Sequence, residues 1–122
     1  MQRPVFFNVL QTQFPVGAIT SAAHRISGIL LAMGIPFSIY LLDLSLDGMD
    51  GYRKSYELLH SLPVQCLAIL FAWALGHHLL AGVRHLLSDI DIGSSLPAAR
   101  RSAWLVNCVS PLFAVMAAMA LL

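Results

Sequence analysis

Three long apolar runs constrain this chain more than any other feature of its sequence. They occupy about residues 19–42, 62–87 and 103–122, and each has the roughly 20 helical residues needed to cross a hydrocarbon core of about 30 Å. Because backbone groups in lipid must bond within their own segment, we expect helices rather than strands. With 58% hydrophobic and 11% charged residues, the chain is too apolar for an ordinary water-soluble domain. We predict an all-α membrane protein, a single transmembrane anchor domain over residues 1–122 with three transmembrane helices.

The segments outside the apolar runs have separate predicted roles. The segment before the first run includes the apolar residues Phe6, Phe7, Val9 and Leu10. We expect this N-terminal segment to lie along the membrane interface or under a partner. Residues 51–60 are predicted to form a short interfacial helix, and residues 88–100, which contain Gly93 and Pro97, are predicted to form a turn.

Basic residues are divided unequally between the two ends of the predicted helices. Five lie at one end: Arg3, Arg25, Arg84, Arg100 and Arg101. Arg53 and Lys54 lie at the other end, in a loop that also carries four acidic residues. Because an excess of Lys and Arg marks the cytoplasmic side, we expect the N-terminus in the cytoplasm and the C-terminus in the periplasm. The net charge of +1 gives no reason to expect nucleic acid as a partner.

The start of the chain bears on which membrane holds it. It shows neither the basic region of a signal peptide nor an Arg-rich, Ser-rich transit segment. The chain also begins almost directly at the interfacial segment. We therefore expect a bacterial inner membrane rather than a mitochondrial one.

Polar residues recur on one face of the second predicted helix. Four of them are spaced i, i+4, i+7 and i+11: His78, Gly82, His85 and Asp89. His77 and Arg84 belong to the neighbouring stripe. An Arg at a helix centre costs about 2.5 to 3.5 kcal/mol on the insertion scale, so such residues usually face a site, a cavity or a partner helix.

A histidine with a glycine one turn later suits a flat macrocycle such as haem. The imidazole nitrogen of His78 would bind the iron, and Gly82 would let the ring lie against the backbone. His78 is about nine residues, or roughly 13 Å, from the inner end of its helix. Arg25 and His24 are at a level to meet the haem propionates, which the planar guanidinium can bind twice. The alternative is a histidine that bonds a neighbouring helix, and spacing alone does not separate His77 from His78.

The start of the first predicted helix carries a second candidate pair. Ser21 and Arg25 are spaced i, i+4, so a hydroxyl and a cation lie side by side and suit a quinone carbonyl. The alternative is a helix cap beside a cation that extends to the membrane surface, and spacing alone favours it. Arg84 and His85 have the same alternative as surface anchors.

Two motifs at the ends of the first two runs resemble a known family. SAAHRISG opens the first run as S-x-x-H-R-x-S-G, and HLLAGVRHLLSD closes the second as H-x-x-x-G-x-R-H-x-x-x-D. Together with an early Arg-Pro pair and two arginines before the third run, they resemble the cytochrome b subunit of succinate dehydrogenase. The resemblance covers nearly the whole chain.

The resemblance implies a haem b site. It makes His78 an axial ligand of the haem iron, because only His78 is followed by glycine at i+4 and by Arg-His at i+6 and i+7. It places Arg25 and His24 near the propionates. Gly82 and His85 belong to the same haem environment, and the role of His85 stays open.

The resemblance also implies a quinone site. Ser21 and Arg25 would bind ubiquinone, and Asp89 would lie nearby and help supply protons. Partner flavoprotein and iron–sulfur subunits would oxidise succinate and pass electrons through iron–sulfur clusters to the quinone. The chain itself has no dinucleotide motif and no cysteine set for a cluster. The resemblance therefore predicts a membrane-anchor subunit.

The predicted haem site is incomplete in this chain, because a low-spin haem b needs two axial ligands. His24 lies at the inner boundary, and His60 lies in the outer loop. His85 lies two turns from His78 on the same helix, so both side chains point the same way. We expect a second small membrane subunit to supply the other ligand.

Two alternatives stay open at this point. The chain could anchor a fumarate reductase, which runs the reaction in the opposite direction. It could also be a non-enzymatic membrane protein that serves assembly or helix packing, in which case it would hold no haem.

Overall fold

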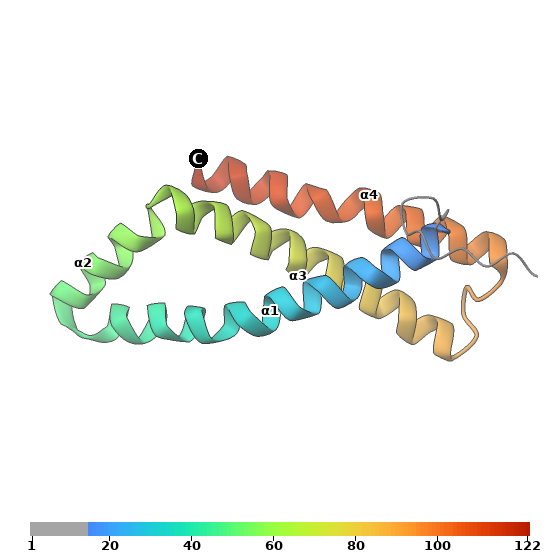
Figure 1. Ribbon diagram of the computed structural model, residues 1–122, viewed down its shortest axis with the longest axis horizontal. Helices are drawn as coiled ribbons and strands as arrows, with labels where there is room; N and C mark the ends of the chain where they lie inside the picture. The colour runs from blue at the N-terminus through green and yellow to red at the C-terminus, as the bar shows by residue number, and fades with distance from the viewer. Residues whose placement is uncertain (1–14) are drawn as a thin grey trace, which may run out of the picture.

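The structure is a computed structural model that describes residues 15–122. Within this range it contains the helices α1 (Val16–Leu46), α2 (Gly48–Leu59), α3 (Leu62–Asp89) and α4 (Leu96–Leu121) (Figure 1). Three of them, α1, α3 and α4, are long and apolar enough to cross a membrane. This confirms the predicted all-helical fold with three membrane helices. The interfacial segment predicted around Phe6, and the basic residue Arg3, lie outside the described residues.

The three long helices run back and forth along one axis. α1 leads to the short α2 at the far end, α3 returns and crosses α1, and α4 lies alongside α3 (Figure 1). α3 packs most extensively against α4 and next against α1, whereas α1 has a smaller contact with α4. α1 and α3 diverge toward α2, so the closest meeting of all three helices lies toward the other end.

The connection between α3 and α4 is shorter than predicted. α4 begins at Leu96, so the turn predicted over residues 88–100 occupies only the segment between the two helices. Pro97 does not belong to the turn. It stands in the first helical turn, where its missing N–H is not needed. Asp91 and Gly93 adopt positive φ angles of 60° and 70°, which reverse the chain.

The helix predicted over residues 51–60 is confirmed as α2, although it begins at Gly48. Gly51 and Ser55 are buried, and a Cβ atom on Gly51 would collide with the carbonyl oxygen of Leu44. Tyr52 and Tyr56 are exposed. The small residues of α2 therefore let it fold back closely on the end of α1.

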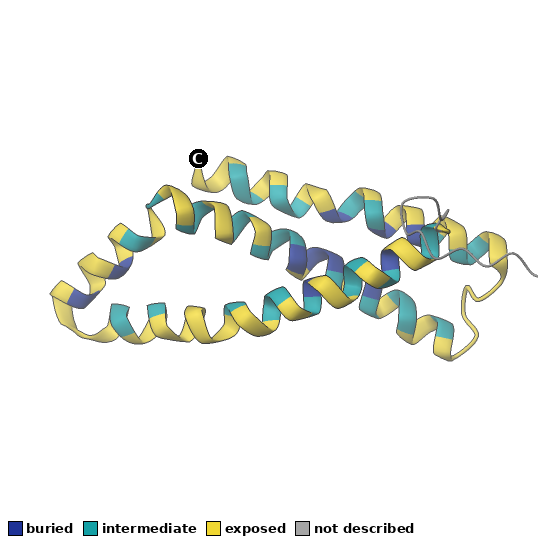
Figure 2. Cartoon of the chain, in the orientation of Figure 1, coloured by how far each residue is buried: buried dark blue, intermediate teal, exposed yellow. Residues whose placement is uncertain are grey.

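The interior is made of small and polar residues. The buried hydrophobic side chains of the described residues are small: Ala74, Ala81, Ala103 and Val106. The buried polar ones are Thr20, Ser27, Ser55, His77 and Ser110. Most of them gather where α1 crosses α3 beside α4 (Figure 2). Membrane helices typically approach through such residues, and the large apolar side chains remain outside, where lipid or a partner helix can cover them.

Candidate functional site

The candidate site lies where α1 crosses α3. Gly28 of α1 faces His78 of α3, and a Cβ atom on Gly28 would lie 3.0 Å from Cε1 of the imidazole. The missing side chain therefore admits the histidine ring. Sequence reasoning did not assign Gly28 a role, although it is the last residue of the first motif.

His78 is held by α1 through one ring nitrogen. Its Nδ1 lies 3.1 Å from the carbonyl oxygen of His24 and 3.3 Å from Oγ of Ser27. Because a carbonyl only accepts, Nδ1 carries the proton and donates it to His24, which leaves the lone pair on Nε2. In the described part of the chain, Nε2 has no hydrogen-bond partner. Histidines that bind metals through one nitrogen usually have the other fixed in this way.

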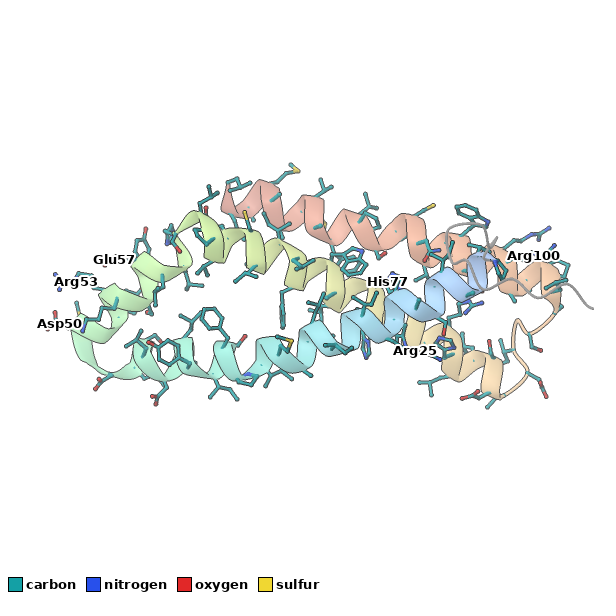
Figure 3. All side chains as sticks on the ribbon, in the orientation of Figure 1. Arg25, Asp50, Arg53, Glu57, His77 and Arg100 are labelled. Atoms are coloured by element: carbon teal, nitrogen blue, oxygen red, sulfur yellow. The ribbon has the colours of Figure 1, made fainter. Side chains whose placement is uncertain are left out.

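His77 has a different environment from its neighbour. It is the largest fully buried side chain among residues 15–122, with 2% of its surface exposed, and Figure 3 shows it on α3 close to the crossing with α1. Its Nε2 lies 3.3 Å from the carbonyl oxygen of Thr20, and its Nδ1 lies 3.1 Å from Oγ of Ser110. Nε2–H donates to Thr20, so Nδ1 accepts from the Ser110 hydroxyl. Both nitrogens of His77 are engaged between helices, and this geometry favours His78 as the histidine that binds a metal.

The structure brings the remaining predicted haem-environment residues to the same place. The imidazole of His24 stacks on that of His78, with ring centroids 4.2 Å apart and planes 10° from parallel. The ring of His85 lies 5.1 Å from that of His24. A Cβ atom on Gly82 would be 3.6 Å from Nε2 of His24. Gly82 therefore faces the imidazole of His24 in this chain.

The three residues predicted for quinone binding have looser surroundings. Arg25 and Asp89 are exposed, and Ser21 is partly exposed. Arg25 lies on α1 near its crossing with α3 (Figure 3). Among residues 15–122, no hydrogen bond or ion pair joins Asp89 to Ser21 or Arg25. Ser21 and Arg25 are one turn apart on α1, so their polar groups remain available to a ligand or partner at this surface.

Of the two interpretations left open for Arg84, a surface anchor or a residue that faces a neighbouring helix, the structure favours the second. Its Nε donates to Oγ of Ser102 at 2.9 Å, and its Nη2 donates to the carbonyl oxygen of Ala99 at 3.2 Å. The guanidinium therefore joins α3 to the first turns of α4. This satisfies a charge on a membrane helix without requiring its extension to the surface.

The donor set at the crossing fits one axial position of haem iron. The described residues contain no group of three or more His, Cys, Asp or Glu side chains arranged to hold a bare metal ion. A macrocycle supplies four of the iron ligands itself, so a single imidazole with an available Nε2 is what the protein must add on one side.

Comparison with known proteins agrees with this geometry. Over residues 1–117, the chain matches the family described as succinate dehydrogenase/fumarate reductase transmembrane subunit. The succinate dehydrogenase cytochrome b556 subunit of Coxiella burnetii is 34% identical over 117 residues, which cover 95% of this chain and 94% of the relative. The subunit of the same name from Paracoccus denitrificans is 29% identical over 114 residues, covering 93% and 88%. That of Rickettsia typhi is 28% identical over 102 residues, covering 83% and 78%.

The family match covers residues 1–117, a range that contains the positions of both motifs of the candidate site. They confirm the predicted resemblance. The chain therefore belongs to the succinate dehydrogenase/fumarate reductase transmembrane subunits and, among these, to the cytochrome b556 membrane-anchor subunits of succinate dehydrogenase.

Proposed function

We propose that this chain binds haem b through Nε2 of His78 and contributes to a ubiquinone site in the membrane part of succinate dehydrogenase. The observation that carries the proposal is the bond from Nδ1 of His78 to the carbonyl oxygen of His24. It sets the ring orientation and leaves the lone pair on Nε2. The relatives named cytochrome b556 support haem as the cofactor. When bound, haem b supplies a one-electron redox centre.

A second histidine for haem b would come from another membrane subunit. Two imidazoles of this chain could hold one haem only if each pointed a ring nitrogen at it from a different side. The ring of His24 instead stacks face to face on that of His78, and both nitrogens of His77 are engaged. His60 lies at the opposite end of the long helices, after α2, where its ring stacks on that of Tyr56. We infer that haem b is shared with a second small membrane subunit.

At the quinone site, Ser21 and Arg25 form one wall and partner subunits form the rest. The Arg25 guanidinium stabilises the negative charge that develops on a quinone oxygen during reduction. Ser21 orients the carbonyl by donating a hydrogen bond. Reduction of ubiquinone consumes two electrons and two protons, and Asp89, which is exposed on α3, helps supply the protons to the quinone. Electrons arrive from succinate through the flavoprotein and iron–sulfur subunits.

The charge distribution supports the proposed orientation in a bacterial inner membrane. Arg25 and Arg100 lie toward one end of the molecule, whereas Asp50, Arg53 and Glu57 lie at the other (Figure 3). The basic end therefore faces the cytoplasm, where the flavoprotein and iron–sulfur subunits dock, and the C-terminus faces the periplasm. A periplasm-active reporter fused after Leu122 should be active. Activity of a cytoplasm-only reporter at that position would contradict this orientation.

The haem proposal is tested by reduced-minus-oxidised spectra of the purified complex. His78→Ala should abolish or strongly perturb the haem b bands because it removes an iron ligand. His77→Ala is the matched control on the adjacent residue and should retain haem. Equal haem loss in both variants would indicate a folding defect, and normal haem bands in His78→Ala would overturn the proposal.

The quinone proposal has a separate test. Arg25→Leu should lower succinate–ubiquinone reduction by at least about tenfold, because it removes the cation beside the developing charge. Succinate-dependent reduction of a soluble dye, which the partner subunits carry out, should persist. Unchanged ubiquinone reduction in this variant would remove Arg25 from the site.

A further inference from the structure

We propose that His77 is a positioning residue. It determines the rotation of α3 about its own axis and thereby the orientation of the imidazole of His78. The inference rests on the proposed function of His78 as a haem ligand. It assigns a task to a buried, hydrogen-bonded histidine that takes no part in ligation. The argument depends on which atoms of α1 and α4 hold the two neighbouring rings.

The two histidines hydrogen-bond to α1 at successive turns. Nε2 of His77 donates to the carbonyl oxygen of Thr20, and Nδ1 of His78 donates to that of His24. On α1 these carbonyls are one turn apart, whereas on α3 the two histidines are adjacent and about 100° apart in direction. Rotation of α3 in either direction would lengthen at least one of the two bonds. The pair therefore determines the rotation of α3 about its own axis.

The third helix, α4, hydrogen-bonds to His77 and to Thr20 at the same place. Ser110 of α4 donates to Nδ1 of His77. The hydroxyl of Thr20 lies 3.1 Å from Oδ1 of Asn107, also on α4. His77 is thus the central member of a polar cluster that joins three helices in a fully buried position. Polar bonds between membrane helices contribute about 0.6 kcal/mol each on average, and several together favour one arrangement over slightly rotated ones.

The two rings are held in opposite tautomers. His77 carries its proton on Nε2 because Thr20 offers only a carbonyl, and His78 carries its proton on Nδ1 because His24 offers only a carbonyl. Loss of the His77 bonds would remove one of the two histidine bonds from α3 to backbone carbonyls of α1, so that the bond from His78 to His24 alone would remain. The imidazole plane of His78 would then turn relative to α1, without loss of the ligand itself.

The test uses the assembled complex and four variants. His77→Phe keeps a ring but removes both bonds, and His77→Gln restores a donor near the position of Nε2. Ser110→Ala removes one partner of His77. Ser38→Ala is the matched control, because the Ser38 hydroxyl bonds only within α1, to Gly34. The measurements are haem content, the g values of the low-spin haem in electron paramagnetic resonance, and the haem reduction potential.

We expect His77→Phe to retain haem but to shift the low-field g value and the reduction potential, since both respond to ligand orientation. His77→Gln should return both toward the unmodified complex, Ser110→Ala should shift them less, and Ser38→Ala should not shift them. Unchanged g values and potential in His77→Phe would overturn the proposal. If that variant does not assemble, unchanged signals in Ser110→Ala would overturn it.

The outcome is distinguishable from failure of the haem proposal. If His78→Ala keeps its haem bands, then His78 is not the ligand, whatever the His77 variants show. If His78→Ala loses haem while the His77 variants leave the g values unchanged, only the positioning role is wrong.

Discussion

The two ends of the membrane helices are built in opposite ways. At the end that we propose to face the cytoplasm, here called the inner end, α1, α3 and α4 meet through small and polar side chains that bond one another, such as Thr20, His77 and Ser110. At the outer end, α1 and α3 diverge and enclose an apolar cavity of about 360 Å³. Its lining includes Met33, Phe37 and Phe71 and contains no titratable side chain. Figure 2 shows buried residues concentrated at the inner crossing and a largely exposed outer half of α1.

This contrast shows where the chain specifies its own geometry. Lipid tails are as apolar as leucine, so an apolar helix surface gains little free energy when it packs against a neighbouring helix instead of lipid. A buried polar group does favour one helix arrangement over others, because it loses its hydrogen bond if the helix moves. The arrangement of the helices at the inner crossing is therefore determined by this chain itself. The apolar surfaces of the outer half can pack equally well against lipid or against a partner helix. Four substitutions test the difference, each at a defined contact.

The largest effect is expected from Gly76→Leu. Gly76 is buried in α3, and any side chain there would collide with the ring of Phe113 in α4. Overpacking of this kind costs about 1–3 kcal/mol and here separates two helices along their main contact. The amount of assembled complex should fall severely in membrane extracts. Normal assembly would show that the inner packing is as adaptable as the outer packing.

The next effect is expected from Gly28→Ala. The added Cβ would stand 3.0 Å from Cε1 of His78, so the imidazole must shift and its bond to His24 must lengthen. We expect reduced haem content and destabilisation of about 1–2 kcal/mol. Gly17→Ala on the same helix is the control, because its Cβ would lie at an ordinary 3.7 Å from Arg84. Equal haem content in both variants would contradict the close fit at Gly28.

A smaller effect is expected where α3 is tied to α4. Ser102→Ala removes the acceptor of the 2.9 Å bond from Arg84 but leaves the bond to Ala99. The loss should be about 0.6 kcal/mol, the average for polar bonds between membrane helices. Thermal denaturation of the purified complex should show a slightly lower midpoint. Arg101→Gln, at an exposed position, is the control, and an equal change there would remove Arg84 from this role.

The smallest effect is expected from Gly34→Ala in the outer half. A Cβ atom on Gly34 would meet the ring of Phe71, as the one on Gly76 would meet Phe113. Phe71, however, borders the apolar cavity and has space into which it can turn. We expect a cost smaller than the loss of about 0.6 kcal/mol for Ser102→Ala and an unchanged haem spectrum. Haem loss in this variant would show that the outer half also determines the site.

Much of the fold follows from local chemistry along the chain. Apolar runs of about 20 residues predict three membrane helices, because lipid imposes internal hydrogen bonding on any segment of that length. Helical spacing places His78, Gly82 and His85 on one face, since the helix repeat determines direction from residue number alone. The motif match adds the family, which the comparisons confirm.

Other features depend on contacts between distant segments and could not be predicted from spacing. The start of α4 at Leu96 was missed because a polar, proline-containing segment was interpreted as a turn. The bonds of Arg84 to α4 could not be told from a surface anchor, because an arginine near a helix end also suits the membrane surface. The role of Gly28 was missed because its neighbour is fifty residues further along the chain.

His77 and His78 show most clearly what the sequence determines and what only the tertiary structure determines. Their position in an apolar run marked both as residues that must face protein or a ligand, because an isolated polar group in lipid is costly. Which of them bonds helices and which keeps an available nitrogen depends on the acceptors that α1 and α4 present. Thr20 and Ser110 occupy both nitrogens of His77, whereas the carbonyl of His24 holds only Nδ1 of His78. Residue spacing gives direction on one helix, but only the crossing of three helices supplies the partners.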